Sequence, residues 1–346
     1  MESCNRTGST DLRWLLALCT AAGTILLAFV PSGAWLNGAA TPDGQLLAVL
    51  FKQALTVSLM LIVPALWARL AFRTTPWILL ALAGLAYGCG LLFEGSAKDA
   101  LYTLLLLALP GVGLYGLQRF GIGNFRTVLY ESFLILAALF GYACLRDLIR
   151  EGDAFLSTKW ILNRYGEILD GYAAVELDVY SAQILSTVRE TVDAYRLSPE
   201  TVCVPALLLP SMAAGLSNTL FSHLMNRRGG AALSPLPAFA DWRCERWYVL
   251  LIAGFALVTL FLRLARVQNA DALAAVAEPL WRLPCSLAGL CTVRSVAIRF
   301  RKAWIFWIAV AVLLSIPLVG MLLLTVLGML SSLKKSSNVG EDGNRK

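Results

Sequence analysis

The sequence predicts an all-α fold, a polytopic transmembrane helical bundle of about 8–10 spans with one amphipathic extramembrane helical insertion. Of the 346 residues, 58% are hydrophobic and 15% are charged, and the mean hydropathy is +0.69. Soluble domains are roughly half apolar and a quarter charged, because a globule must cover its surface with polar groups. Apolar runs recur between short polar breaks, and about 20 such residues cross a bilayer as a helix. The chain is therefore expected to lie in a membrane.

The first 145 residues are expected to form five N-terminal membrane helices. The first apolar run is long for a signal peptide and lacks a small-residue cleavage site, so we interpret it as a retained span. The segment after it, Pro31–Gln45, contains no Lys or Arg. The positive-inside rule therefore places the N-terminus in the cytoplasm. The expected spans are Trp14–Val30, Leu46–Leu70, Pro76–Phe93, Ala100–Leu117 and Thr127–Leu145.

Basic residues gather at the ends of apolar runs, and the formal net charge is +7. This pattern indicates membrane topology and contact with anionic lipid headgroups rather than nucleic-acid binding. The lipid bilayer is thus the first expected partner, and no nucleic acid is expected. The residues at these ends are Arg69, Arg73, Arg119, Arg126, Arg227, Arg228, Arg299, Arg301 and Lys302.

Residues 146–200 interrupt the apolar pattern. Acidic residues outnumber basic ones there, with a net charge of −4 over residues 150–200. Apolar residues recur at steps of three and four, which is typical of an amphipathic helix that is too polar to span a membrane. We expect an acidic helical insertion on the extracytoplasmic side, with its apolar stripe used for packing. The stripe comprises Leu177, Tyr180, Ile184, Val188, Val192 and Tyr195.

Residues 201–333 are expected to form about four C-terminal membrane helices, followed by a disordered polar tail over residues 334–346. Arg263 and Arg266 would face outward, against the positive-inside rule. The last apolar run, 303–333, has Pro317 and Gly320 near its middle. It can form one long or kinked helix, which we favour, or a hairpin with short arms that leaves the tail inside. The earlier expected spans are Thr201–Met225, Trp247–Leu264 and Ala272–Ile298.

Ionisable residues inside a span are expensive and are therefore candidates for substrate binding. Glu131 lies about one turn into the fifth span, where the alternative is an interfacial carboxylate paired with an arginine. Lys52 lies in the second span, close enough to the outer surface for its amine to reach the interface. Asn218, in the sixth span, is a candidate both for substrate binding and for hydrogen bonding between helices.

Glu278 and Arg282 form the sharpest candidate pair, because residues four apart share a helical face. Pro279 and Pro284 flank Arg282 and free backbone carbonyls in the preceding turn. Many transporters build substrate sites from broken helices with exposed backbone and charge. The alternatives are an internal ion pair that locks the helix bundle and a position nearer the outer interface.

Several signals that would indicate an enzyme or a bound metal are missing. The eight cysteines include no C-x-x-C pair, and His223 is the only histidine. Neither a disulfide framework nor a zinc site is indicated. The sequence also lacks a G-x-x-x-x-G-K-[ST] phosphate loop, a G-x-S-x-G elbow and an H-E-x-x-H motif. We therefore expect no enzyme activity, no cofactor and no metal.

The second half of the chain resembles a known family through a series of short segments. They read LLLPSMAAGLSNTLFSHLMNRR from Leu207, AFADWRCERWYVLL from Ala238, LAGL from Leu287, and a final LLTVLGMLSSL. This order is similar to that of the YybS-like family of uncharacterised bacterial multi-pass membrane proteins. The family often has a proline after the Trp-Arg of its loop, whereas this chain has Cys244 and Glu245 after Arg243.

The resemblance implies a location in the bacterial cytoplasmic membrane. It also implies a distant similarity to the substrate-binding components of energy-coupling-factor transporters. It transfers neither a substrate nor site residues. Together with the residues above, it favours a small-molecule-binding, transport-related membrane protein that depends on a separate energising ATPase module. The alternative is a non-transporting scaffold or assembly factor of another membrane complex, with residues 146–200 as its docking surface.

Overall fold

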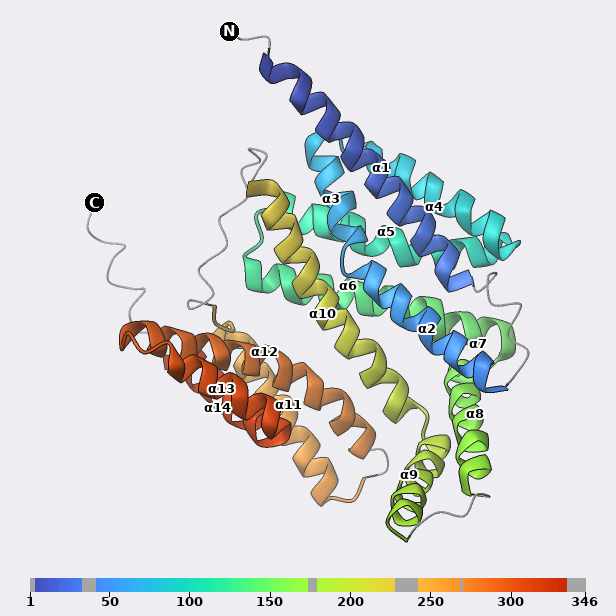
Figure 1. The fold of residues 1–346 in the computed structure, drawn as a ribbon, viewed down its shortest axis with the longest axis vertical. Coiled ribbons are helices and arrows are strands. Elements are labelled where there is room, and N and C mark those ends of the chain that lie inside the picture. Colours follow the sequence, from blue (N-terminus) through green and yellow to red (C-terminus); the bar gives the residue numbers. More distant parts are fainter. Residues whose placement is uncertain (1–3, 33–41, 174–178, 228–241, 268–269, 335–346) are drawn as a thin grey trace. The chain divides into compact units, whose positions relative to one another are not determined.

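The computed structural model describes residues 4–32, 42–173, 179–227, 242–267 and 270–334. The chain divides into two compact units, residues 1–234 and 235–346, and each is described by itself. Every element in the described ranges is helical, which confirms the all-α class (Figure 1). Residues 33–41 of the expected outer loop, the polar tail from residue 335, Arg228 and the loop up to residue 241 lie outside these ranges.

The first unit holds ten α-helices and one π-helical turn within the described ranges. Helices α6, η2 and α7 follow one another without a gap, and η2 is a π-helix. The elements are α1 (Cys4–Ser32), α2 (Pro42–Met60), α3 (Val63–Arg73), α4 (Ile78–Glu94), α5 (Ala97–Arg119), α6 (Asn124–Phe140), η2 (Gly141–Leu145), α7 (Arg146–Glu151), α8 (Leu156–Ala173), α9 (Val179–Leu197) and α10 (Glu200–Arg227).

Six segments in the described ranges are long and apolar enough to cross a membrane. Their outward faces carry exposed apolar side chains such as Leu18, Phe133 and Leu251, as a surface in contact with lipid requires. The chain is therefore an integral membrane protein. The six segments are Arg13–Pro31, Gly44–Arg73, Ala97–Arg119, Phe125–Glu151, Glu200–Met225 and Arg246–Leu264.

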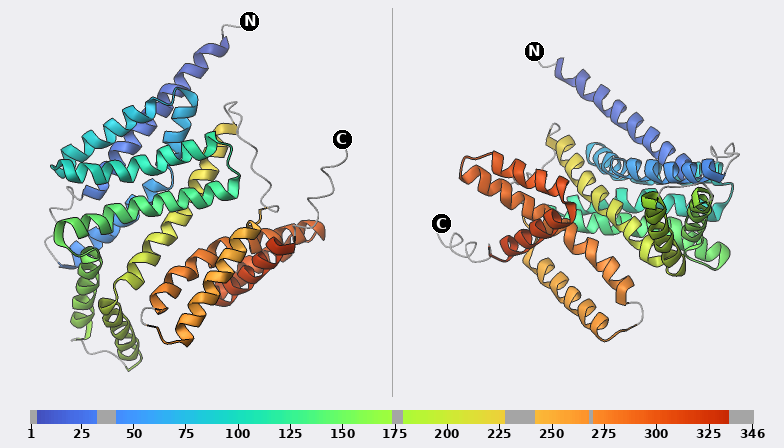
Figure 2. Two further views of the ribbon diagram at one scale, coloured as in Figure 1. Left: turned by 180° about the vertical axis from the view of Figure 1, so that it is seen from behind. Right: turned by 60° about the horizontal axis from the view of Figure 1, so that its bottom comes forward.

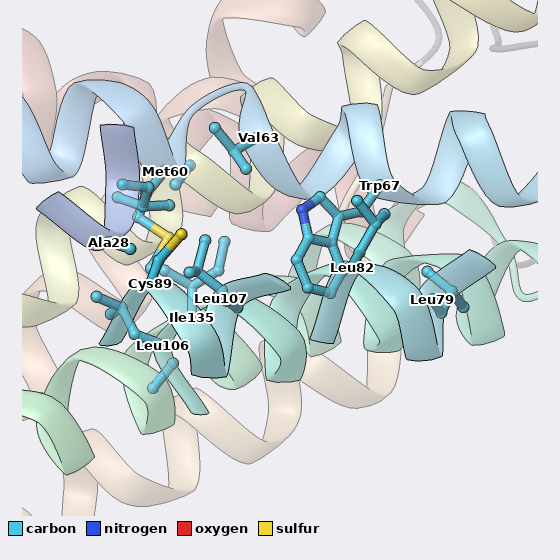
Figure 3. Close-up of a cluster of buried hydrophobic side chains, with 14 of the residues drawn as sticks. Ala28, Met60, Val63, Trp67, Leu79, Leu82, Cys89, Leu106, Leu107 and Ile135 are labelled. Atoms are coloured by element: carbon cyan, nitrogen blue, oxygen red, sulfur yellow. The ribbon is translucent and has the colours of Figure 1, made fainter. Parts of the chain in front are cut away.

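The core of the first unit is centred on Trp67 of α3, which is fully buried. Its indole N–H donates to the Thr24 hydroxyl of α1 at 2.9 Å. Gly111 of α5 packs directly against the indole ring, because a β-carbon there would lie 2.9 Å from it. Helices α1, α3, α4, α5 and α6 surround this cluster (Figure 3). The central position of α5 follows from its small residues, which let α3 approach closely.

The insertion predicted over residues 146–200 contains three helices, α7, α8 and α9, rather than a single amphipathic one. Helices α8 and α9 pack side by side (Figure 2). Arg189 of α9 pairs with Asp170 of α8 at 2.8 Å, and Arg196 donates to the Asn163 carbonyl at 3.1 Å. Of the predicted stripe, Val192 is buried, whereas Ile184 and Tyr195 are exposed. Leu177 and the side chain of Tyr180 lie outside the described residues.

Asp153 sets the start of α8. Its carboxylate accepts from the Phe155 backbone N–H at 3.0 Å and from the Lys159 ammonium at 2.5 Å. The hydrogen bond from Lys159, and then the one from Phe155, lowers the pKa of Asp153 below its ordinary value. A carboxylate at this position also suits the positive end of the helix dipole. These two hydrogen bonds thus define the turn from which α8 begins.

The second unit contains four described helices. They are α11 (Arg246–Leu264), α12 (Ala270–Arg299), α13 (Trp304–Ser315) and α14 (Pro317–Lys334). Helices α12 and α14 approach each other closely at two glycines. A β-carbon at Gly289 would lie 1.8 Å from the Leu324 carbonyl oxygen, and one at Gly328 would lie 1.8 Å from that of Cys285. Such close backbone approach is typical of small-residue packing between membrane helices.

The last apolar run is not one long helix, so the favoured prediction for residues 303–333 is wrong. It breaks at Ile316, directly before Pro317, because proline cannot continue the preceding hydrogen-bond ladder. Helices α12 and α14 run parallel, since Thr325 contacts the Arg282 carbonyl and Ser331 contacts Thr292 farther along both helices. The chain must therefore reverse direction through α13.

Candidate functional site

A broken helix lies inside the second membrane-spanning segment. Helix α2 ends at Met60, and α3 begins at Val63. Pro64 has no backbone N–H, so the Met60 carbonyl loses the donor that an unbroken helix would supply four residues later. A buried carbonyl without a donor is costly in a membrane. The segment therefore needs a partner from another helix.

Asn218 of α10 supplies that partner. Its side-chain N–H donates to the Met60 carbonyl at 2.8 Å, and its side-chain oxygen accepts from the Ala65 backbone N–H at 3.2 Å. Asn218 is fully buried. One amide side chain thus satisfies one backbone group on each side of the break. The predicted role of Asn218 in joining helices is confirmed by these bonds, while substrate binding by Asn218 stays a prediction.

The face of α10 that carries Asn218 consists of small and polar residues. Ser222, one turn later, donates to the Gln118 side-chain oxygen of α5 at 2.8 Å. Gly215, nearly one turn earlier, meets α6 so closely that a β-carbon there would lie 2.2 Å from the Ser132 hydroxyl oxygen. These contacts pack α10 against both α5 and α6.

Glu131 of α6 is fully buried, with 0% of its surface exposed. Within the described part of the chain, neither carboxyl oxygen has a hydrogen-bond partner. A β-carbon at Gly113 of α5 would lie 3.9 Å from Oε2 of Glu131. The alternative of an interfacial carboxylate paired with an arginine is therefore wrong, because Glu131 lies inside the helix bundle.

Arg69 of α3 is a second buried charged group, with 2% of its surface exposed. Among the described residues, its two terminal nitrogens have no hydrogen-bond partner, and the same holds for the side-chain nitrogen of Gln118. Arg69 and Glu131 consequently do not hydrogen-bond to each other. We call Arg69, Gln118, Glu131, Asn218 and Ser222 the buried polar set.

The sequence did not single out Arg69 or Gln118. Arg69 precedes Arg73 at the end of an apolar run, which reads as ordinary positive-inside topology. Its burial depends on the tertiary packing of α3, and the buried stretch of α3 includes Ala65, Trp67, Ala68 and Leu70. The signal in the sequence that could have indicated burial of Arg69 was its position four residues after Ala65, which puts both residues on the same face of the helix.

Lys52 of α2 lies apart from the buried polar set, within electrostatic range of Arg146 and Glu94. Arg146, in the first turn of α7, pairs with Glu94 at the end of α4 at 2.6 Å. It also approaches Asp99 of α5 at 3.5 Å between Nε and Oδ1, and Arg150 pairs with the same Asp99. We call these five residues the end cluster.

Tyr142 forms hydrogen bonds with both Arg146 and Glu94. Its hydroxyl donates to Glu94 at 2.9 Å and accepts from Arg146 at 2.9 Å. Tyr142 lies in the π-helix η2, four residues before Arg146. Single π-helical turns re-aim side chains and are frequent at functional sites. The end cluster ties α4, α5 and the start of the insertion together.

Glu278 and Arg282 belong to the second unit, apart from the other three predicted site residues. They form an ion pair on α12, and 44% of the Glu278 side chain and 25% of the Arg282 side chain are exposed. Helix α12 continues through Pro279 and Pro284. The prediction of a broken helix at this place is therefore wrong. The structure contains a partly exposed ion pair within one helix.

The described residues contain no group of three or more His, Cys, Asp or Glu side chains arranged to hold a metal ion. The buried polar set offers hydrogen bonding and charge, from a carboxyl, a guanidinium, amide groups and a hydroxyl. Comparison with family models, curated proteins and solved structures gives no match to this chain.

Proposed function

We propose that this protein is a transport-related membrane protein whose first unit binds a small polar molecule or ion among its helices. The observation that carries the proposal is the presence of two buried charged side chains without hydrogen-bond partners at their terminal atoms, Arg69 and Glu131, in the unit that contains the break between α2 and α3. Burying a charged group without a partner costs several kcal/mol by order of magnitude. A ligand with complementary groups would offset that cost for Arg69, Glu131 and the Gln118 amide.

The broken segment supports the same proposal. Transporters place substrate and ion sites where a membrane helix is interrupted, because the interruption offers backbone groups and half-helix ends inside the membrane. Here Asn218 occupies two of those backbone groups. A ligand near the break would therefore meet an already ordered backbone. Glu131 and Arg69 would supply charge recognition.

We further propose that a separate energising partner drives transport, because the sequence contains no phosphate-binding loop of its own. The resemblance to the YybS-like family favours the same arrangement and a bacterial cytoplasmic membrane. For the orientation, we propose a cytoplasmic N-terminus, following the positive-inside rule. In this orientation, the end cluster and the α8–α9 hairpin are extracytoplasmic.

A ligand-capture experiment tests the proposal. The purified protein in detergent is incubated with a polar metabolite extract from bacterial cells, unbound molecules are removed, and mass spectrometry identifies what denaturation releases. We expect one compound, or a few related ones, to be enriched by the wild type and lost in Glu131→Gln and Arg69→Gln.

The matched controls are Glu167→Gln and Arg164→Gln, which remove the same groups from an ion pair on α8. They should keep the wild-type ligand. If the wild type and all four variants retained the ligand equally, the buried polar set would not be the binding site. No enrichment by the wild type would contradict ligand binding altogether.

The second candidate function, a non-transporting scaffold, is favoured by the α8–α9 hairpin. The hairpin exposes Tyr165, Tyr172 and Ile184 together with acidic side chains. Purification from native membranes separates the two functions. Recovery of an ATPase-bearing transporter module favours transport, whereas recovery of an unrelated membrane complex favours the scaffold.

A further inference from the structure

We propose that Cys144 and Cys203 form a reversible disulfide bond that joins η2 to the first turn of α10. Their Sγ atoms lie 3.5 Å apart. Both residues are buried, and both thiols are free in the structure. The two thiols are already in contact, about 1.5 Å beyond the length of an S–S bond.

The register of two packed helices brings these thiols together. Helices α6 and α10 are antiparallel, and Gly215 of α10 contacts Ser132 of α6 through backbone as well as side-chain atoms. Cys144 lies twelve residues after Ser132, and Cys203 lies twelve residues before Gly215. The thiol contact therefore continues the same helix pairing, and the close approach at Gly215 keeps that pairing in register.

The two cysteines flank the insertion, so a bond between them would hold its two ends together. Cys144 lies directly before the insertion formed by α7, α8 and α9, and Cys203 lies directly after it. A disulfide between them would fasten both ends of the insertion at one point. In the proposed orientation, this point is at the extracytoplasmic side, where disulfides form and persist. The bond itself does not depend on the proposed function.

The reaction is thiol–disulfide exchange with a disulfide-carrying oxidant, either a protein or a low-molecular-weight disulfide. The Cys203 thiolate attacks one sulfur of the oxidant, forms a mixed disulfide and releases one oxidant thiol. The Cys144 thiolate then attacks the Cys203 sulfur and releases the second oxidant thiol. The two cysteines lose two protons and two electrons, which reduce the oxidant. A dithiol reductant reverses both steps.

A fragment-linkage experiment tests the proposal in the full-length chain. A protease recognition sequence is inserted between α8 and α9, and membranes containing this parent protein are treated with oxidised glutathione, alkylated and cleaved. On a non-reducing gel, we expect the two fragments to stay joined and to separate after dithiothreitol. Separation without reductant would overturn the proposal.

Three cysteine variants give the comparison. Cys144→Ser and Cys203→Ser should each release the fragments without reductant, whereas Cys89→Ser, which removes a buried thiol of α4, should leave them joined. Linkage that survives either of the first two substitutions would overturn the pairing.

Peptide mapping of the oxidised, unsubstituted protein gives a measurement that needs no folded variant. A peptide joining Cys144 to Cys203 supports the proposal, and its absence, or either of these two residues joined to a different cysteine, contradicts it.

Discussion

The side-chain amide of Asn218 donates to the carbonyl oxygen of Met60, the acceptor that would otherwise have no helical donor. The donor is missing because residue 64 is a proline. The same amide accepts from Ala65, on the other side of the break. One residue of α10 therefore makes it possible for a membrane-spanning segment to be interrupted without leaving these groups unpaired.

Replacing Asn218 by leucine should destabilise the first unit. The substitution keeps a side chain of similar length but leaves a buried carbonyl and a buried N–H without partners. We expect the free energy of unfolding to fall by about 1–3 kcal/mol. Titration with a denaturing detergent in mixed micelles measures this change.

A double-mutant cycle with Pro64→Ala tests the physical reason for that loss. Alanine at residue 64 restores a backbone N–H for the Met60 carbonyl. The Asn218→Leu substitution should therefore cost less in the Pro64→Ala background, by about 1 kcal/mol. Equal costs in the two backgrounds would mean that Asn218 does not compensate for the proline.

Gly215→Val should separate α10 from α6. Its β-carbon would lie 2.2 Å from the Ser132 hydroxyl oxygen, 2.7 Å from the Ser132 backbone nitrogen and 2.9 Å from the Val128 carbonyl oxygen. Two of these atoms belong to the backbone and cannot rotate away, so overpacking should cost about 1–3 kcal/mol or more. The thermal midpoint in detergent should fall accordingly.

Gly88→Val of α4 is the matched control, because nothing lies within 4 Å of a β-carbon at that position. It should change the thermal midpoint much less than Gly215→Val. Similar losses at Gly88 and Gly215 would indicate a general effect of β-branched residues on these helices rather than a steric conflict at the α6–α10 contact.

The sequence was sufficient to predict the fold class and most of the spans, because hydropathy is a local property. Five apolar runs over the first 145 residues correspond to α1, the α2–α3 pair, α4, α5 and α6. The break at Met60 was not predicted, whereas one was expected at Pro279 and Pro284. Proline content alone cannot distinguish the two, because the partner of the first break lies 158 residues away.

The candidate site was predicted only in part, for the same reason. Glu131 and Asn218 were found because polar residues inside apolar runs are rare. Arg69 was missed because a basic residue at the end of a run has an ordinary topological explanation. Its burial is decided by tertiary packing, which no local pattern reports. Lys52 was found, but its place in the end cluster depends on the positions of α4 and α7.

Arg146 should matter more to stability than Arg150, although both approach Asp99. The Arg146 side chain is 14% exposed and contacts both Glu94 and Asp99, whereas Arg150 is 45% exposed. Removing Arg146 leaves two nearly buried carboxylates poorly compensated, so Arg146→Gln should cost about 3 kcal/mol. Arg150→Gln should cost less than about 1 kcal/mol.

Detergent denaturation of the two variants, side by side, measures this difference. A larger loss in Arg150→Gln would mean that the exposed arginine, not the one beside Tyr142, holds the end cluster together. High salt should weaken the Arg150 contribution more than that of Arg146, because exposed charges are screened more strongly.

Gly328→Leu should open the contact between α12 and α14 and expose Cys285. A β-carbon at Gly328 would lie 1.8 Å from the Cys285 carbonyl oxygen, and Cys285 is fully buried. Overpacking should destabilise this contact by about 1–3 kcal/mol, which should raise the fraction of molecules in which α12 and α14 are separated. The rate at which maleimide labels Cys285 should rise with that fraction, by roughly tenfold.

The measurement uses a chain that retains Cys285 as its single cysteine. Gly254→Leu of α11, where nothing lies within 4 Å of a β-carbon, should leave the labelling rate unchanged. A similar increase in both variants would mean that labelling follows general loosening of the second unit rather than the glycine contact.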